Sequence, residues 1–284
     1  MNKMVLVPLV MAFSLSAHAA DFTVNLTPAD SSVSDQQVNT ISSSKITAFA
    51  SSVISAMSST LSSYLAKTDM KAVVLKKLNA SQTYNPPAGV LYLKVKVIGG
   101  GGGGNAGGSA GTSPQAGNGG VTSFGTDLVA NGGIGGIEGG SADGGTFSCG
   151  AITSCWGMQG SVGQGFGYLS NNANGGQGRG GMGGMSILGG NGWGASDRAG
   201  GSAVVNSGSG GAGGDSSSTT SGSRAGSGGG AGGNVEAVLA GSDLKASFVV
   251  VIGSKGQGST SINASGYKGG DGATGTVIVE EHYQ

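Results

Sequence analysis

The most suggestive chemical motif in the sequence is a glycine-rich stretch directly after a strand-like run, LYLKVKVIGGGGGG. Gly99, Gly101 and Gly104 fit the spacing G-x-G-x-x-G, with which dinucleotide-binding domains hold a pyrophosphate. That use needs a helix that begins at the glycines and an acidic residue about twenty positions later. The chain instead continues NAGGSAGTSPQAGNGG, which cannot form a helix, and the first acidic residue, Asp127, lies in a strand-like run. The pattern therefore argues against nucleotide binding.

Side chains for acid–base catalysis or metal binding are scarce in the rest of the chain. Beyond the first 20 residues the only histidine is His282, in the C-terminal sequence EEHYQ. If this end is a strand, Glu280 and His282 share one face and Glu281 lies on the other, so a solvated strand end is a better interpretation than a metal site. A serine hydrolase of the usual kind needs a well-placed histidine as its base. We therefore expect no enzymatic activity, no catalytic residues, no cofactor and no metal.

Charged residues are sparse and do not cluster. They make up 10% of the chain, and the formal net charge is zero. Because no basic stripe is present to neutralise phosphates, we expect no nucleic-acid partner. Asp271, within GGDGATG, lies among the oxygen-rich groups that calcium uses, although an aspartate beside glycines more commonly caps a turn.

The N-terminal sequence MNKMVLVPLVMAFSLSAHAA has the pattern of a secretory signal peptide. An apolar run between Met4 and Leu15 follows Lys3, and the small residues of AHA at 17–19 form a cleavage site of the usual kind. A transmembrane helix needs about 20 consecutive apolar residues, and this run is shorter. We expect residues 1–20 to be removed and the protein to be secreted through the periplasm, to an extracellular, cell-surface or virion location.

The two cysteines, Cys149 and Cys155, lie close together in CGAITSCW. An exported protein reaches an oxidising compartment, where such a pair is usually a disulfide. The catalytic C-x-x-C spacing is absent, and no histidine lies nearby to complete a zinc site. The spacing therefore predicts a structural disulfide that closes a short loop.

Residues 30–80 contain no glycine or proline, and their pattern predicts a helix. Apolar residues recur at steps of three to five and form one narrow stripe on a surface of serine, threonine and lysine. The members of the stripe are Val38, Ile41, Ile46, Phe49, Val53, Met57, Leu61 and Tyr64. Since one stripe cannot bury itself, it must pack on the rest of the chain or on copies of itself in a coiled coil. Residues 38–65 are predicted to form a stalk that makes the protein a homo-oligomer, for example a trimer.

The remainder of the chain alternates between short strand-like runs and glycine tracts. The runs VLYLKVKVI, VTSFGTDLV, NVEAVLA, ASFVVVIG and GTVIVEEHYQ show the β-branched residues or the period-two alternation of strands. Of the 62 glycines, 52 fall between Gly99 and Gly233. Apolar runs therefore lie at both ends of this part of the chain, with glycine between them.

Glycine-rich tracts are commonly flexible linkers. The alternative is an ordered bundle of polyglycine II helices, which have three residues per turn and no internal hydrogen bonds, so that their amides bond to neighbouring segments. Large apolar residues occur within the tracts, and a linker does not need them. We therefore expect a mainly β fold over residues 83–284, a small β-sandwich-like domain with glycine-rich, polyglycine II-type insertions, preceded by the N-terminal amphipathic α-helical segment.

Four aromatic residues in or beside the glycine tracts are candidates for ligand contact: Trp156, Phe166, Tyr168 and Trp193. Aromatic rings on a scaffold of low charge offer stacking surfaces for sugars and apolar contacts for proteins. The competing interpretation is that each ring fills an edge of the bundle or the sandwich core.

Three segments resemble the bacterial and phage glycine-rich domain family. TYNPPAGVLYLKVKVIGGGGGG is similar to the opening of that family, GNGGVTSFGTDLVANGGIGG to its second signature, and GGDGATGTVIVEEHYQ to its closing strand. The penultimate segment, SDLKASFVVVIGSKGQG, departs from the family pattern because it lacks the usual proline-containing turn. The resemblance implies a small β-sandwich-like core with long glycine insertions, of the kind found in phage tail fibre tips and exported surface proteins.

Together these features predict an exported, non-enzymatic surface adhesin or receptor-binding protein that presents a rigid glycine-rich tip. Its expected partner is a host-surface protein or glycan. A passive structural component of a matrix, coat or virion is the alternative, and ice binding is a weaker one because no regular threonine ladder is present.

Overall fold

The computed structural model describes residues 43–67, 73–109, 113–165, 179–194, 198–216, 223–261 and 266–283. The chain divides into two compact units, Met1–Leu65 and Ala66–Gln284. The predicted signal peptide and residues 30–42 of the predicted helical segment lie outside the described residues.

Helix α2, Ser43–Lys67, is the described part of the first unit and ends two residues past its boundary. Two members of the predicted apolar stripe, Val53 and Met57, are 37% and 46% exposed, so that in the single chain the stripe is not covered at these positions. In the described part of the chain, no helix is both long and apolar enough to cross a membrane. Self-association through residues 38–65 stays a prediction.

The second unit contains two five-stranded sheets, in which all neighbouring strands are antiparallel. Sheet 1 has the order β1-β12-β3-β10-β8, with β1 Val74–Leu78, β3 Val90–Ile98, β8 Cys155–Met158, β10 Asn234–Ala240 and β12 Thr276–Tyr283. Sheet 2 has the order β2-β11-β5-β6-β7, with β2 Gln82–Tyr84, β5 Thr122–Phe124, β6 Leu128–Ala130, β7 Phe147–Ser148 and β11 Phe248–Val251. A small third pairing joins β4, Gly108–Ser109, to β9, Ser223–Arg224. The prediction of a mainly β, sandwich-like fold is confirmed.

The core lies between the facing sides of the two sheets. Leu93, Val95 and Val97 of β3 are fully buried, because alternate residues of a strand point to the same face. From sheet 2, the Phe124 ring stacks on Phe248, with 4.5 Å between the ring centroids. These side chains belong to one continuous cluster contributed by both sheets, and burial of their apolar surface is what holds the sheets together.

Two predictions about local structure are wrong. The helix ends at Lys67, and residues 74–78, which we expected to be helical, form the edge strand β1. They pair with β12, and only Leu78 packs against the core, since Val74 and Leu75 are exposed. The run VTSFGTDLV, expected as one strand, is a hairpin of β5 and β6, with Gly125 in the turn at a φ of 66°. Glycine adopts such an angle readily because it has no Cβ.

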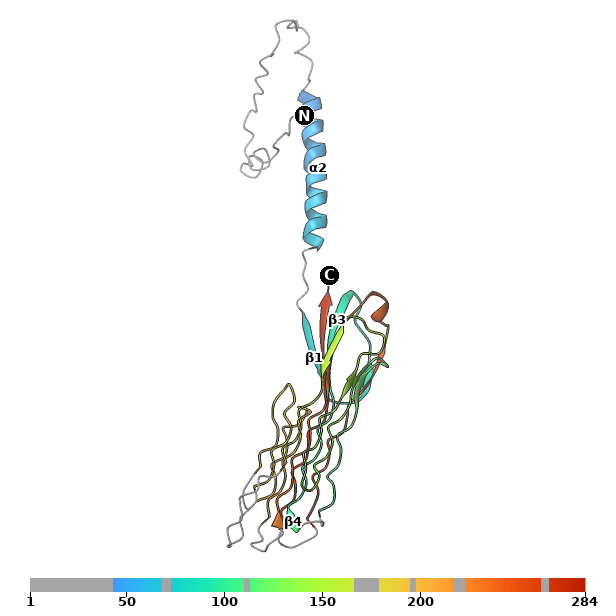
Figure 1. Cartoon of the computed structure of the whole chain (residues 1–284). Helices are drawn as coiled ribbons and strands as arrows, with labels where there is room; N and C mark the ends of the chain where they lie inside the picture. Colours follow the sequence, from blue (N-terminus) through green and yellow to red (C-terminus); the bar gives the residue numbers. More distant parts are fainter. Residues whose placement is uncertain are drawn as a thin grey trace, which may run out of the picture. The chain divides into compact units, whose positions relative to one another are not determined.

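Glycine-rich segments leave the sheets and run side by side to the far end of the second unit, where β4 lies (Figure 1). Their backbone hydrogen bonds repeat every three residues. Segment 99–107 donates to segment 267–273 from Gly101 to Ala273, from Gly104 to Gly270 and from Gly107 to Tyr267. This three-residue repeat is the one expected of polyglycine II helices, whose amides point in three directions in turn.

Segment 99–107 is surrounded by such partners. It donates to three segments, 117–120, 227–233 and 267–273, and accepts from three others, 133–136, 211–214 and 256–259. Segments 208–215 and 226–233 are likewise bonded to neighbours on several sides. The backbone of the central glycine region is therefore paired sideways, as buried amides and carbonyls require.

The close approach of these segments explains why glycine dominates here. A Cβ added to Gly104 would lie 1.9 Å from the carbonyl oxygen of Ala212, and one added to Gly101 would lie 1.9 Å from that of Ser209. Real atoms cannot come so close, so at these positions the array accepts only glycine.

Candidate functional site

The structure describes two of the four aromatic residues predicted to contact a ligand, and both are exposed. Trp156 is 53% exposed on β8, and Trp193 is 70% exposed in the glycine bundle. Phe166 and Tyr168 lie outside the described residues. Neither tryptophan fills the sandwich core, and their role in ligand contact stays a prediction.

Trp156 is held in place by the predicted disulfide and by the sheet. Cys149 and Cys155 form the disulfide, as the sequence predicts. Cys155 begins β8, which pairs with β10 so that Trp156 lies opposite Glu236. The next residue, Gly157, leaves room for the ring of Phe147, since a Cβ there would lie 2.5 Å from a ring carbon. Strand β8 is thus fixed on three sides and presents Trp156 on the outer face of sheet 1.

A pocket of about 350 Å³ lies at the end of β8, where sheet 1 meets the glycine bundle. Its walls come from residues 158–161, which leave β8, from residues 185–187, and from Gly232 and Asn234, where the chain enters β10. Met158, Met185 and Ile187 supply large apolar side chains. The volume is at the lower end of the range for small-molecule sites.

The polar side chains around the pocket differ in how they are bonded. The Gln159 amide donates to the carbonyl oxygen of Gly144. The Ser161 hydroxyl donates to the Met185 carbonyl oxygen and accepts from the Met185 amide. The Asn234 side chain, by contrast, has no hydrogen-bond partner for Oδ1 or for Nδ2 among the described residues, although the residue is only 3% exposed.

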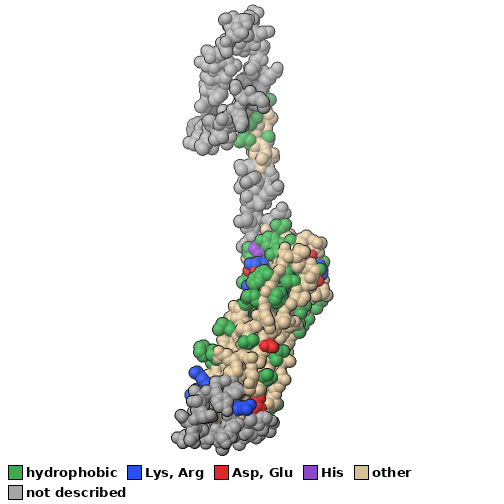
Figure 2. Space-filling view, viewed as in Figure 1, with side chains coloured by type: hydrophobic (Ala, Val, Ile, Leu, Met, Phe, Trp, Pro, Cys, Tyr) green, Lys and Arg blue, Asp and Glu red, His purple; other side chains and the backbone are tan. Residues whose placement is uncertain are grey.

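Two turns of the bundle extend the apolar surface of the pocket. They carry Met185, Ile187, Leu188, Val204 and Val205, each at least 40% exposed, which we call the apolar shelf. The turns are neighbours, because the Val204 amide donates to the Gly190 carbonyl oxygen at 2.7 Å. Figure 2 shows hydrophobic side chains in separate patches on a surface of mostly backbone and small side chains. The sequence identified some of these residues as unusual in glycine tracts but not as one surface.

Next to Trp156, the outer face of sheet 1 carries an ion-pair network. Glu236, which is 7% exposed, accepts from Lys94 at 3.3 Å and from Lys96 at 3.2 Å. The hydrogen bond with Glu236 raises the pKa of Lys94 above its ordinary value. The network places charged hydrogen-bonding groups beside an exposed indole ring.

The C-terminal acidic residues have structural partners. The His282 ring stacks on Tyr92, with 4.3 Å between centroids, and its Nε2 lies 3.5 Å from a Glu280 oxygen.

Glu281 points into the sandwich and accepts from Lys76, Tyr84 and Tyr283. Burial alone would raise the pKa of Glu281, but these three donors outweigh it and the pKa is lowered. Burial and the neighbouring Glu281 together hold the pKa of Tyr84 far above its usual value. Among the residues that the structure describes, no group of three or more histidine, cysteine, aspartate or glutamate side chains could hold a metal.

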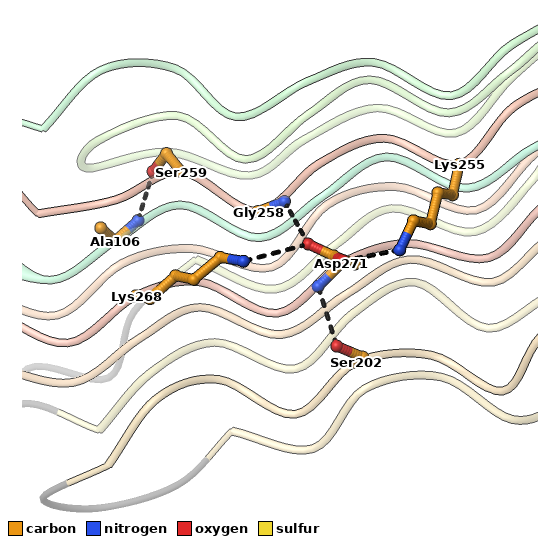
Figure 3. A network of polar contacts seen from close by, with 7 residues as sticks. All are labelled: Ala106, Ser202, Lys255, Gly258, Ser259, Lys268 and Asp271. Carbon is orange, nitrogen blue, oxygen red and sulfur yellow. Dashed lines mark hydrogen bonds and ion pairs between the residues drawn. The ribbon is translucent and has the colours of Figure 1, made fainter.

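Asp271 links segments of the bundle, as Figure 3 shows. Its carboxylate accepts from the Gly258 amide at 2.9 Å and from Lys255 at 2.8 Å, and Lys268 lies 3.6 Å away. Burial is the largest influence on its pKa and raises it, but Lys255, Gly258 and Lys268 together lower the pKa below the ordinary value. Asp271 therefore forms ion pairs with two lysines and holds adjacent backbones, which corrects the prediction that it caps a turn.

The glycines that match G-x-G-x-x-G have no amides to offer a phosphate. The Gly99 amide donates to Gly233, that of Gly101 to Ala273, and that of Gly104 to Gly270. No known protein family, curated protein or solved structure matches this chain. The resemblance to the glycine-rich domain family and the expectation of no enzymatic activity stay predictions.

Proposed function

We propose that this chain is an exported, non-enzymatic surface adhesin or receptor-binding protein that presents a glycine-rich tip to a host-surface protein or glycan. The observation that carries the proposal is the number of large apolar side chains exposed at Trp156, at the pocket that begins two residues later at Met158, and on the apolar shelf. Large exposed apolar patches on a soluble domain mark interaction sites.

The scaffold supports this role because it fixes the surface without a large side-chain core beneath it. The Ser186 amide donates to the Ser209 hydroxyl at 3.0 Å, and the Leu188 amide donates to the Ser186 hydroxyl at 3.1 Å. The turns of the apolar shelf are thus bonded to the bundle. Apolar side chains held in a preformed arrangement lose little conformational entropy when a partner covers them.

The test is binding of the fluorescently labelled protein to a panel of intact bacterial and eukaryotic cells. An adhesin gives saturable binding to particular cells. Trp156→Ala, alone and with Ile187→Ser and Val205→Ser, should reduce that binding stepwise while the melting temperature stays within about 2 °C, because surface substitutions change stability little.

Val249→Ser is the matched control. Val249 is 64% exposed on β11, in the other sheet, so its replacement removes exposed apolar surface without touching the proposed site. This variant should bind like the wild type. A protein that binds no cell type saturably would instead be a passive component of a matrix, coat or virion.

A further inference from the structure

The apolar shelf differs from Trp156 in its surroundings. Among the described residues, Val205 is the most exposed large hydrophobic residue, at 75%. The two segments that carry the shelf, residues 180–196 and 199–214, contain no charged residue. Trp156, by contrast, lies opposite Glu236 and its two lysines. The shelf therefore lacks the polar and charged rim that surrounds most protein–protein interfaces.

The two turns of the shelf are bonded to each other. The Ser186 hydroxyl of the first turn donates to the Ser207 carbonyl oxygen of the second. The Ser209 hydroxyl donates to the Gly189 carbonyl oxygen at 2.6 Å, in the opposite direction. The shelf is therefore one fixed surface and not two independent loops.

Asn206 holds the second turn in a conformation that is uncommon for residues other than glycine. Its φ is 57°, in the left-handed region. The Thr274 hydroxyl stabilises this conformation, since it donates to Asn206 Oδ1 at 2.8 Å and accepts from the Asn206 amide at 3.2 Å. The turn thus exposes Val204 and Val205, at 61% and 75%, on a fixed backbone.

The backbone of both turns is bonded within the protein. Six amide groups donate to serine or threonine hydroxyls or to carbonyl oxygens: those of Met185, Ser186, Leu188, Gly189, Val204 and Asn206. An exposed turn in water does not need such acceptors, because water supplies them. A surface that enters hydrocarbon does need them, since an unpaired backbone group is costly there.

Charged groups lie at one margin of the shelf. The Asp271 amide donates at 3.1 Å to the hydroxyl of Ser202, two residues before Val204, and the Asp271 carboxylate is paired with Lys255 and Lys268 (Figure 3). The two lysine side chains are 41% and 50% exposed, and the three groups together carry one positive charge. Lysines beside an apolar surface can reach lipid phosphates while their apolar neighbours enter the acyl chains.

We infer that the apolar shelf docks on the surface of a lipid bilayer, with Ile187, Leu188, Val204 and Val205 in the outer part of the acyl region. Because the shelf itself is uncharged, zwitterionic lipid is sufficient. The inference adds the lipid of the bound cell to the protein or glycan of the proposed function, and it does not depend on that function.

The direct test is flotation of the purified protein with vesicles of phosphatidylcholine. A single myristoyl chain binds bilayers with a constant of about 10⁴ M⁻¹, and the five partly exposed side chains insert less hydrocarbon, so half of the protein should be bound at a lipid concentration on the order of 1 mM. Phosphatidylglycerol in part of the lipid should raise the affinity about fivefold, through the one positive charge. Absence of binding at about ten times this lipid concentration overturns the inference.

Variants show which surface binds the vesicles. Leu188→Asp together with Val205→Asp should weaken binding at least about tenfold, since a charged side chain does not enter hydrocarbon readily. Val249→Asp adds the same charge at an exposed position of β11 and should bind like the wild type. Val53→Asp with Met57→Asp, on the exposed stripe of α2, should also bind like the wild type. Undiminished binding by the shelf variant, or loss of binding only in the α2 variant, overturns the assignment.

A second measurement keeps the shelf apolar. Leu188→Trp, in a protein that also carries Trp156→Phe and Trp193→Phe, should lose fluorescence in vesicles of phosphatidylcholine brominated in the acyl chains. Val249→Trp in the same background is the control and should keep its fluorescence. Equal quenching of the two variants overturns insertion of the shelf.

Cell binding separates this inference from the proposed function. Saturable cell binding by a protein that binds no vesicles overturns lipid docking, assigns the shelf to a protein partner and leaves the adhesin function standing. Vesicle binding by a protein that binds no cell type saturably overturns the adhesin function and leaves lipid docking in place.

Discussion

The second unit joins two regions that are built from the same extended backbone but are stabilised in different ways. In the sandwich, strands bond to their neighbours within a sheet, and the two sheets bury side chains such as Leu93 and Phe124 between them. In the glycine bundle, segment 99–107 is bonded to six neighbouring segments and has almost no side chain to bury. Backbone hydrogen bonds between neighbouring segments therefore stabilise the bundle, where an apolar core stabilises the sandwich.

The difference teaches how glycine can stabilise a fold. Glycine loses more backbone entropy on folding than any other residue, so a glycine segment with few partners stays unfolded. In the bundle, the absence of Cβ atoms lets each segment approach its neighbours closely enough to bond with all of them. A side chain that stabilises the sandwich would destroy the bundle, and a glycine that the bundle needs would weaken the sandwich.

The largest expected effect comes from one methyl group in the centre of the bundle. Gly104→Ala would place a Cβ 1.9 Å from the Ala212 carbonyl oxygen, and the three atoms nearest to it are all backbone, which cannot move aside as a flexible side chain could. We expect a loss of at least about 4 kcal/mol in the free energy of unfolding, measured by urea denaturation.

Gly165→Ala is the control for this substitution. Its added Cβ would lie 3.4 Å from the nearest atom, the Gly140 carbonyl oxygen, which is an ordinary contact. The free energy of unfolding should stay within about 0.5 kcal/mol of the wild type. Equal behaviour of the two variants would show that the segments are not closely packed.

The next largest loss of stability is expected from a substitution in the core of the sandwich. Phe124→Ala removes a ring that is 1% exposed and stacks on Phe248. The lost burial and the cavity should reduce the free energy of unfolding by about 3 to 4 kcal/mol, measured by the same denaturation. A loss below about 1 kcal/mol would mean that the two sheets do not share a core.

Removing the disulfide is expected to cause a smaller loss of stability. Replacing Cys149 and Cys155 together by serine removes the constraint on a short loop and should destabilise the protein by about 2 kcal/mol. Since Cys155 begins β8, the change should also increase amide exchange at Trp156 more than in β3. Unchanged exchange in β8 would argue that pairing with β10 alone fixes the strand.

The smallest expected effect is a pH dependence in the sandwich. Because the folded protein lowers the pKa of Glu281, its contribution to stability is complete above the ordinary glutamate value of about 4.3 and is lost as pH falls through the folded-state pKa. The melting temperature of the wild type should exceed that of Glu281→Gln at pH 7, and the difference should shrink by pH 3. A difference that stays constant between these pH values would contradict the ion pair with Lys76.

Local patterns in the sequence were sufficient to predict much of the sandwich. NVEAVLA matches β10 from Asn234 to Ala240, because alternation and β-branched residues act within one strand. Residues 74–78 were misassigned because VLKKL also fits a helix, and only pairing with β12 decides between the two structures. The hairpin turn at Gly125 was hidden inside an otherwise strand-like run.

The candidate site was predictable only in part. Trp156 could be identified from the sequence, because nothing in the neighbouring residues explains a large aromatic side chain beside a disulfide and among glycines. The pocket was not predictable, since it forms where residues 158–161, 185–187 and Asn234 meet, and these are far apart in the sequence. Nothing in the sequence around Asn234 indicates that its amide lacks a partner.

Amide hydrogen exchange is the most direct test of the claim that the glycine bundle is an ordered body held by backbone bonds. Segments 99–107, 208–215 and 226–233 are predicted to exchange as slowly as β3 and β10, because their amides donate to neighbouring backbones in the same way. Exchange in these three segments at the rate of an unfolded chain, while β3 and β10 stay protected, would contradict the account.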